Sequence, residues 1–197
     1  EVVVWPESGE EVADVLRYAN ERRIPVYVRG AGTGLAGACV PVYGGILMNM
    51  MKMDRLLEVR PVDFQAVVEP GIVYDHLNRL LEPHGLFFPP DPGSSRSCTI
   101  GGMVANNASG LRAVKYGVTR DYVLSLRIAL PDGRLLRLGA NVFKSSVGYD
   151  LVRLLVGSEG TLGVVTEVTL RLRRLPRARY TFAAYFDSIE AGVSAIN

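Results

Sequence analysis

The sequence predicts an α+β protein, in which helices and strands are mixed without the regular alternation of a doubly wound sheet. An amphipathic helix follows Ser8, and a strand hairpin is centred on Pro131-Asp132-Gly133. Between the predicted strands at 26–28 and 46–51, glycines and Pro41 occupy the place where a crossover helix would lie. Because parallel β-α-β units need a helix in such a connection, these observations favour the α+β class.

The first part of the chain contains two predicted helices. Ser8 and Glu11 have the spacing of a capping box, and apolar residues at positions 12, 15, 16 and 19 form one helix face that ends before Pro25. Apolar residues at positions 73, 77, 80 and 81 mark a second helix, which Gly85 closes. Strands are expected at residues 26–28, 46–51 and 65–69.

The second half of the chain is richer in predicted strands. Residues 123–130 and 134–138 flank the turn at 131–133 and predict the hairpin. A short helix is expected over 150–156, and the alternating pattern of 162–173 predicts one long strand.

The end of the sequence is interpreted as the beginning of a further domain. Residues 180–186 have the composition of a strand, Asp187 and Ser188 form a helix cap, and the sequence stops within the helix that follows. Because this strand–helix unit is unfinished, we expect one domain over 1–176 and the start of a truncated C-terminal cap domain over 177–197.

Composition and charge exclude several functional classes. The 197 residues are 48% hydrophobic and 21% charged, which indicates a globular rather than a disordered chain. The 22 basic and 20 acidic residues nearly balance, whereas a nucleic-acid-binding protein needs a basic stripe. The local excess of basic residues comprises Arg171, Arg173, Arg174, Arg177 and Arg179. We interpret this cluster as a solvated strand end or an interface, and we expect no nucleic-acid partner.

The cysteines and the longest uncharged stretch indicate the redox state of the protein and its location in the cell. Two cysteines, Cys39 and Cys98, provide neither a disulfide framework nor a four-ligand zinc site. The uncharged stretch at 30–51 contains six glycines and Pro41, so a membrane-spanning helix is not expected. We expect no metal, no transmembrane segment and a cytoplasmic location, with peripheral contact to the inner face of the membrane as an alternative.

Glycines are concentrated in three segments that carry few charges and many hydroxyl or amide groups. Successive glycines allow the backbone to approach a ligand closely, so that several N–H groups can point at one anion. This arrangement is typical of a diphosphate site, whereas a single glycine run more often marks a tight turn. The segments lie at residues 29–37, 99–110 and 157–163.

Two familiar nucleotide motifs do not account for these segments. Residues 32–37 match the G-x-G-x-x-G pattern, and Asp54 lies near the expected position of a ribose-binding acid. The pattern requires a following helix, but Pro41, Gly44 and Gly45 leave no room for one. A P-loop sequence is also absent. A nicotinamide-binding module is therefore disfavoured.

Four motifs, taken together and in order, are more specific than any single glycine segment. They are Pro25-x-x-x-Arg29-Gly-Ala-Gly-Thr-Gly-Leu-Ala-Gly37, Pro90-Asp-Pro-Gly-Ser94, Thr99–Gly110 continuing to Lys115-Tyr-Gly117, and Gly157-Ser-Glu-Gly-Thr-Leu-Gly-Val-Val-Thr166. Over nearly the whole chain, the sequence resembles the FAD-binding domain of the vanillyl-alcohol oxidase superfamily. It is most similar to the branch of the glycolate oxidase D subunit and FAD-linked D-lactate dehydrogenase.

The resemblance implies a two-subdomain FAD-binding fold of the vanillyl-alcohol oxidase type, with the subdomains divided near residues 118–122 and FAD held between them. It implies that the first glycine segment wraps the diphosphate, that the second lines the diphosphate, ribityl and flavin sides, and that the third borders the ring systems. The residues assigned in this way are Gly30, Ala31, Gly32, Thr33, Gly34, Leu35, Ala36, Pro92, Ser94, Ser95, Thr99, Gly101, Gly102, Asn107, Ala108, Ser109, Gly110, Leu111, Glu159, Gly160, Thr161, Gly163, Val164 and Val165.

The sequence departs from the family pattern at two positions. Relatives that bind FAD covalently have a histidine where this chain has Thr33, which cannot form that bond, so non-covalent FAD is predicted. Ser109 replaces a glycine in the second segment, a change that adds a hydroxyl and should not abolish binding.

Few titratable side chains are candidates for chemistry. His76 and His84 belong to the second predicted helix and its end, and Asp91 is interpreted as a turn former. Arg112 and Lys115 would face either the flavin and the substrate carboxylate or the solvent. No nucleophile–base pair is recognisable, so no catalytic residue is assigned.

The resemblance implies the FAD-binding portion of an oxidoreductase that oxidises a small D-2-hydroxy acid, of the glycolate or D-lactate type, to the 2-oxo acid. Hydride would pass from substrate C2 to flavin N5, while a base in the C-terminal cap domain takes the hydroxyl proton. Expected partners are the substrate, the cap domain, and other oxidase subunits or an electron acceptor. The alternatives are an alkylglycerone-phosphate-synthase-like enzyme and a non-catalytic flavoprotein subunit.

Overall fold

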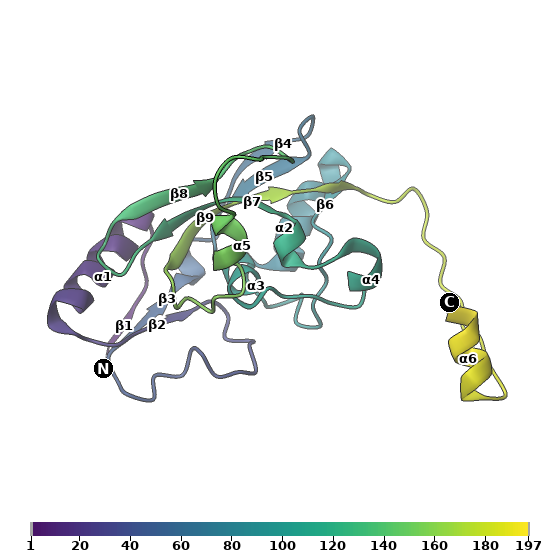
Figure 1. Ribbon diagram of the computed structural model, residues 1–197, viewed down its shortest axis with the longest axis horizontal. Helices are drawn as coiled ribbons and strands as arrows, with labels where there is room; N and C mark the ends of the chain where they lie inside the picture. Colours follow the sequence, from purple (N-terminus) through teal and green to yellow (C-terminus); the bar gives the residue numbers. More distant parts are fainter. Residues whose placement is uncertain (1, 197) are drawn as a thin grey trace.

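Three separate sheets organise the computed structural model, which describes residues 2–196 (Figure 1). The helices are α1 (Gly9–Arg22), α2 (Tyr74–Leu81), α3 (Ile100–Asn106), α4 (Ala113–Tyr116), α5 (Leu151–Leu155) and α6 (Ile189–Ile196), with 3-10 turns at Met50–Lys52, Glu82–His84 and Thr119–Asp121. The strands are β1 (Val2–Val4), β2 (Val26–Arg29), β3 (Ile46–Asn49), β4 (Leu56–Arg60), β5 (Gln65–Val68), β6 (Leu86–Phe87), β7 (Val123–Ala129), β8 (Leu135–Gly139), β9 (Val164–Arg171) and β10 (Arg173–Arg174). The α+β prediction is confirmed.

The first sheet is parallel, with β3 between β1 and β2. Helix α1 connects its two edge strands, and the Ser8 hydroxyl accepts a hydrogen bond from the Glu11 N–H at 3.2 Å, as the capping pattern predicts. Val12 and Leu16 of α1 are buried in a core cluster that also contains Met48 of β3 and Val164 of β9. This helix therefore joins the first sheet to the second.

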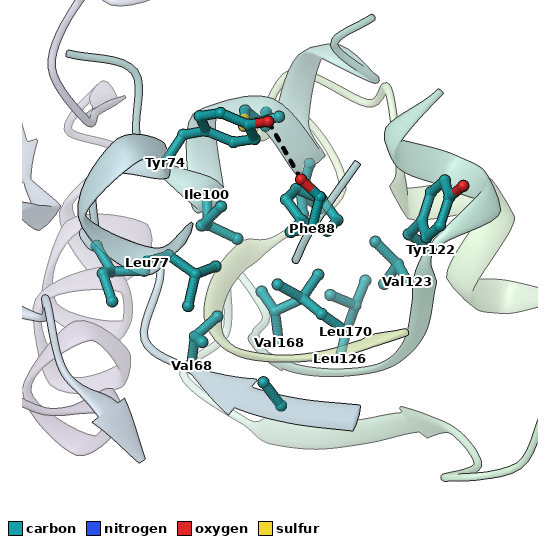
Figure 2. Close-up of a cluster of buried hydrophobic side chains, with 14 of the residues drawn as sticks. Val68, Tyr74, Leu77, Phe88, Ile100, Tyr122, Val123, Leu126, Val168 and Leu170 are labelled. Carbon is teal, nitrogen blue, oxygen red and sulfur yellow. Dashed lines mark hydrogen bonds between the residues drawn. The ribbon is translucent and has the colours of Figure 1, made fainter. Parts of the chain in front are cut away.

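The second sheet has five antiparallel strands in the order β4-β5-β9-β7-β8. The predicted hairpin is confirmed, because β7 pairs with β8 along five residues. Apolar side chains on one face of the sheet, including Val68, Leu126 and Val168, meet Leu77 of α2 and Ile100 of α3 (Figure 2). Burial of this face supplies the main hydrophobic stabilisation of the fold.

Polar groups close to this core are paired rather than excluded. The Tyr74 hydroxyl donates to the Phe88 carbonyl oxygen at 3.1 Å (Figure 2). The Asn78 side chain accepts from the Phe88 N–H at 2.8 Å. These bonds satisfy backbone groups of the segment that follows β6. They hold that segment against α2.

Several predicted boundaries were wrong because local side chains or pairing end the strands early. The strand predicted at 46–51 ends at Asn49, whose side chain accepts from the Met51 N–H and starts a 3-10 turn. The long strand predicted at 162–173 is divided, since β9 pairs with β5 and β7, whereas β10 pairs with β6.

The strand predicted at 180–186 was also wrong. The segment has no regular secondary structure, and Tyr180, Phe182 and Tyr185 are exposed. Strand formation requires a pairing partner, which this part of the chain lacks within residues 2–196. Helix α6 follows where expected, after Ser188, and lies away from the sheets (Figure 1).

The domain division stays a prediction. The five-stranded sheet takes β4 and β5 from before residues 118–122 and β7 to β9 from after them.

Candidate cofactor site

A cavity of about 420 Å³ draws its lining from segments that are distant in the sequence. Most of the lining comes from residues 28–39, from Pro92 and Ser94, from parts of 98–108 and from parts of 158–165, and Met50, Pro70 and Leu155 complete it. These are the loop after β2, the start of α3, and the loop before β9. The volume lies within the roughly 300–1,000 Å³ that is usual for small-molecule sites.

The loop after β2 forms one wall of the cavity. Strands β2 and β3 are parallel, yet the connection between them contains no helix, as the glycines and Pro41 predict. Gly32 has a φ of +73°, and a Cβ on it would lie 2.9 Å from Arg29 Nε. Gly34 has open space around it, because a Cβ would meet nothing within 4 Å. The backbone at Gly34 is therefore accessible to a ligand.

The second glycine segment is a helix start rather than a loop. Thr99 is the N-cap of α3, and its hydroxyl accepts from the Gly102 N–H at 3.3 Å. A Cβ on Gly101 would lie 2.6 Å from Pro70 Cβ, and one on Gly30 would collide with Thr99 Oγ1. At Gly101 glycine allows close packing, and its N–H donates to the Pro70 carbonyl oxygen at 2.7 Å.

The third glycine segment turns against α3 before β9 begins. The N–H groups of Gly157 and Glu159 each donate at 2.9 Å, to the carbonyl oxygens of Val104 and Ala105. Glu159 has a φ of +52°, which is unusual for a residue other than glycine. This strained conformation places Glu159 on the cavity wall, with Val164 and Val165 beyond it at the start of β9.

Arg29, the last residue of β2, was not predicted as a site residue. Its Nε is buried without a hydrogen-bond partner in the structure, and the residue lines the cavity. An unpaired buried donor of this kind is costly unless a ligand accepts from it. The sequence contained a signal for it, because Arg29 directly precedes the uncharged stretch at 30–51.

A family model described as an FAD binding domain matches residues 1–139 of the chain. The chain belongs to this FAD-binding family. FAD is therefore the cofactor of this domain.

Several curated proteins and solved structures are similar to the chain. It is 40% identical to the glycolate oxidase subunit GlcD of Bacillus subtilis over 100% of this chain and 42% of that protein. It is 45% identical to a D-lactate dehydrogenase of Archaeoglobus fulgidus over 99% of this chain and 44% of that protein. A structure of alkyldihydroxyacetonephosphate synthase superposes with a TM-score of 0.78 at 31% identity, covering 89% of this chain and 34% of that one. The chain thus spans about two fifths of the length of its curated relatives.

The residues that line the cavity fit FAD. Glycine backbone is open at residue 34, and the unpaired Nε of Arg29 suits an anionic group. The lining carries one carboxylate, Glu159, so little negative charge opposes a diphosphate. Apolar side chains such as Met103 and Val164 complete the wall.

The structure brings most of the predicted site residues to this cavity. Those in the lining are Gly30, Ala31, Gly32, Thr33, Gly34, Leu35, Ala36, Pro92, Ser94, Thr99, Gly101, Gly102, Ala108, Glu159, Gly160, Gly163, Val164 and Val165. Lining residues that sequence reasoning missed include Val28, Arg29, Met50, Pro70, Cys98, Met103, Asn106, Leu155 and Ser158. Most of these are apolar core residues, which carry no sequence signal distinguishing a cavity wall from the interior.

Six predicted residues lie outside the lining, namely Ser95, Asn107, Ser109, Gly110, Leu111 and Thr161. Four of them make structural contacts. The Ser95 carbonyl oxygen accepts from the Asp75 N–H at 3.2 Å. Asn107 ends α3 with a φ of +47°, and its side chain accepts from the Arg120 N–H at 2.9 Å. A Cβ on Gly110 would collide with the Asp91 carbonyl oxygen, and the Thr161 hydroxyl donates to the Ser158 carbonyl oxygen at 2.6 Å.

The titratable residues singled out from the sequence do not converge on the cavity. His76, His84 and Asp54 are exposed and do not line it. Arg112 pairs with Asp91, with Nη2 and Oδ2 2.8 Å apart, so Asp91 anchors an arginine, and the turn that follows begins at Gly93 rather than at Asp91.

Burial alters the titration of two side chains near the cavity. Desolvation raises the pKa of the Cys98 thiol above its ordinary value, and it likewise raises the pKa of the buried Tyr74 hydroxyl. Both groups therefore remain protonated at neutral pH and do not act as nucleophiles there.

Residues 2–196 contain neither a metal-binding cluster nor a membrane-spanning helix. No cluster of three or more His, Cys, Asp or Glu side chains in this range is arranged to hold a metal ion. Within the same range, no helix combines the length and apolar character needed to cross a bilayer.

Proposed function

We propose that this chain is the FAD-binding portion of a flavin-dependent oxidoreductase that oxidises a small D-2-hydroxy acid, of the glycolate or D-lactate type, to the 2-oxo acid. The observation that carries the proposal is the cavity between the loop after β2, α3 and the loop before β9, in a chain of the FAD-binding family. The substrate class is supported by the relatives named glycolate oxidase subunit and D-lactate dehydrogenase.

The chain's own residues bind and orient the cofactor in this proposal. Arg29 Nε and the backbone around Gly34 hold the diphosphate, while Met103, Val164 and Val165 exclude water from the apolar part of the cofactor. Bound FAD accepts the electrons removed from the hydroxy acid. Thr33 stands where covalent relatives have the bonding histidine, so this proposal takes the attachment to be non-covalent.

FAD binding is tested by titrating the purified chain with FAD and measuring bound flavin from its visible absorption after desalting. We expect about one FAD per chain, released in full when the protein is denatured. Flavin that stays attached after denaturation would contradict non-covalent binding, and a folded chain that never retains flavin would contradict the site.

Gly34→Val is the most informative variant at the site. A Cβ at Gly34 meets no neighbour within 4 Å, so the added side chain leaves the fold intact and projects into the loop that must contact FAD. Gly32 is less suitable, because its φ of +73° makes any side chain strained. We expect Gly34→Val to lower FAD affinity at least tenfold, a loss of about 1.4 kcal/mol or more.

Gly192→Val serves as the matched control, because Gly192 lies in α6, away from the cavity, and its Cβ would make only ordinary contacts of 3.5 Å or more. Both variants should show the circular dichroism of the parent chain. Equal loss of FAD in the two variants would argue against the assignment of the loop.

Arg29→Gln tests the buried donor directly. The guanidinium has no protein partner at Nε, so its removal leaves no other group unsatisfied there. We expect FAD affinity to fall about tenfold, as for loss of one charge-assisted hydrogen bond. Riboflavin, which has no phosphate, should bind the parent and the variant equally if Arg29 contacts the diphosphate.

The oxidation itself is tested in a chain extended to the length of the relatives, since the 197 residues span about two fifths of that length. Reduction of a dye by glycolate and D-lactate, but not by L-lactate, is expected. Further oxidase subunits and a cap domain as partners belong to the same proposal, and co-purification with the extended chain tests them.

A second candidate is an alkylglycerone-phosphate-synthase-like function. The structural neighbour named alkyldihydroxyacetonephosphate synthase supports it, although its 31% identity is lower than that of the oxidase and dehydrogenase relatives. Turnover of an acylated glycerone phosphate by the extended chain, without reduction of a dye, would favour this candidate. A flavin-loaded chain inactive in both assays would instead indicate a non-catalytic subunit.

A further inference from the structure

A second concave surface, the basic groove, lies apart from the FAD cavity and shares no lining residue with it. Its volume is about 600 Å³, which is within the range of small-molecule sites. The groove is lined by Phe64, Lys115, Tyr116, Phe143, Arg171, Leu172, Arg173 and Arg174. These residues come from the turn between β4 and β5, from α4, from the loop after β8, and from the β9–β10 segment.

The lining of the groove carries positive charges and no negative ones. Four of its eight lining residues are cationic and none is acidic. None of the four takes part in an ion pair within residues 2–196, whereas Arg55, Arg60, Arg112 and Arg127 do. Like charges held close together repel one another, and a bound anion relieves that repulsion.

Aromatic rings hold three of these cations in place. The Arg171 guanidinium lies 4.7 Å from the ring centre of Phe143, Arg174 lies 5.3 Å from Phe64, and Lys115 Nζ lies 5.2 Å from its neighbour Tyr116. Such contacts restrict long side chains that would otherwise lose freedom when a ligand binds. The same rings give the groove flat apolar surfaces beside its charges.

The backbone at Phe64 adopts a strained conformation at the edge of the groove. Phe64 has a φ of +53°, which is unusual for an aromatic residue, and its carbonyl oxygen accepts from the Leu172 N–H at 2.7 Å. That bond links the turn to the β9–β10 segment and keeps the ring beside Arg174. Backbone strain of this type concentrates at ligand sites.

We propose that the basic groove binds a small organic anion that carries a phosphate, or two carboxylates, on a flat ring. Arginine presents paired N–H donors that match both kinds of oxyanion, and the rings offer stacking surfaces. The groove sets four cations among three aromatic rings within one concavity of about 600 Å³, which suits a small ligand better than an extended nucleic acid.

The proposal is tested by isothermal titration calorimetry on the 197-residue chain saturated with FAD, so that the first cavity is occupied. The probes are phenyl phosphate and phthalate, with inorganic phosphate and phenol as the separate anion and ring. We expect phenyl phosphate or phthalate to bind saturably, about tenfold more tightly than inorganic phosphate. Preference between the two probes identifies phosphate or dicarboxylate as the recognised group.

The double variant Arg171→Ser/Arg174→Ser locates the binding, and Arg79→Ser, an exposed arginine of α2, is its charge control. The groove variant should lose about tenfold in affinity, whereas the control should stay within about twofold of the parent. Circular dichroism establishes that both variants are folded.

Three results would overturn the proposal: no saturable binding of either ring anion below about 10 mM, binding no tighter than that of inorganic phosphate, or equal loss in the control. Bound flavin is measured separately by absorption. If no flavin binds, phenyl phosphate and phthalate are titrated into the FAD-free chain, and loss of affinity in the groove variant but not in the control still locates binding to the groove. Failure of the FAD proposal is therefore distinguishable from failure of the groove proposal.

Discussion

The first and second glycine-rich segments have similar compositions but different surroundings. The loop at 30–37 is largely exposed and contains no helix, whereas the segment at 99–110 begins as α3 and packs against neighbouring backbone. Gly34 has nothing near it, while Gly101 and Gly110 leave no space for a Cβ. Glycine thus keeps the backbone at residue 34 open to a ligand, whereas at residues 101 and 110 it allows close packing.

The largest expected effect of this difference is on stability. In Gly110→Ala the new methyl group would collide with the Asp91 backbone, which cannot move aside as a flexible side chain can. We expect the free energy of unfolding to fall by about 3 kcal/mol, while Gly34→Ala changes it by less than about 0.5 kcal/mol. Urea denaturation followed by circular dichroism measures both, and similar values would remove the distinction between the segments.

The two cysteines provide a chemical comparison of the same regions. Cys39 is half-buried beyond the first loop, whereas Cys98 is buried just before Thr99, and burial raises the pKa of its thiol. Alkylation requires the thiolate. Because the pKa of the Cys98 thiol is raised, its thiolate fraction near neutral pH is lowered. At pH 8 we expect iodoacetamide to modify Cys39 at least about tenfold faster than Cys98.

Peptide mass spectrometry after timed quenching measures the two rates. Both cysteines line the cavity proposed for FAD, so saturating FAD should slow the modification of Cys39. Equal alkylation rates of Cys39 and Cys98 without FAD would show that Cys98 is not buried as the structure describes.

The smallest predicted effect concerns the contact between the two segments. A Cβ on Gly30 would collide with Thr99 Oγ1, so Gly30→Ala should destabilise the chain. Thr99→Ala removes the hydroxyl and costs about 1 kcal/mol through loss of the α3 cap. In the double variant the collision is absent, and we expect a coupling free energy of about 1 kcal/mol in a double-mutant cycle. Additive effects would show that the segments do not touch there.

Features that depend on neighbouring residues in the sequence were the most predictable. The cap at Ser8, the hairpin around Pro131-Asp132-Gly133 and the Gly85 end after α2 were all confirmed. Strands β1, β4 and β6 were missed, and the strand predicted at 180–186 does not form. Strand formation depends on partners that are distant in the sequence, as β5 pairs with β9 across about one hundred residues.

The sequence by itself determined the α+β class, the family of the chain and therefore its cofactor, because glycine segments and caps are local patterns that survive without knowledge of contacts. Only the tertiary structure decided which glycines open a cavity and which permit packing, since that depends on what faces each Cα. It also revealed the buried, unpaired Nε of Arg29 and gathered Lys115, Arg171 and Arg174 around aromatic rings in one groove. Both features depend on the tertiary fold. Burial of a side chain and the distance between charges are set by residues that are far apart in the sequence.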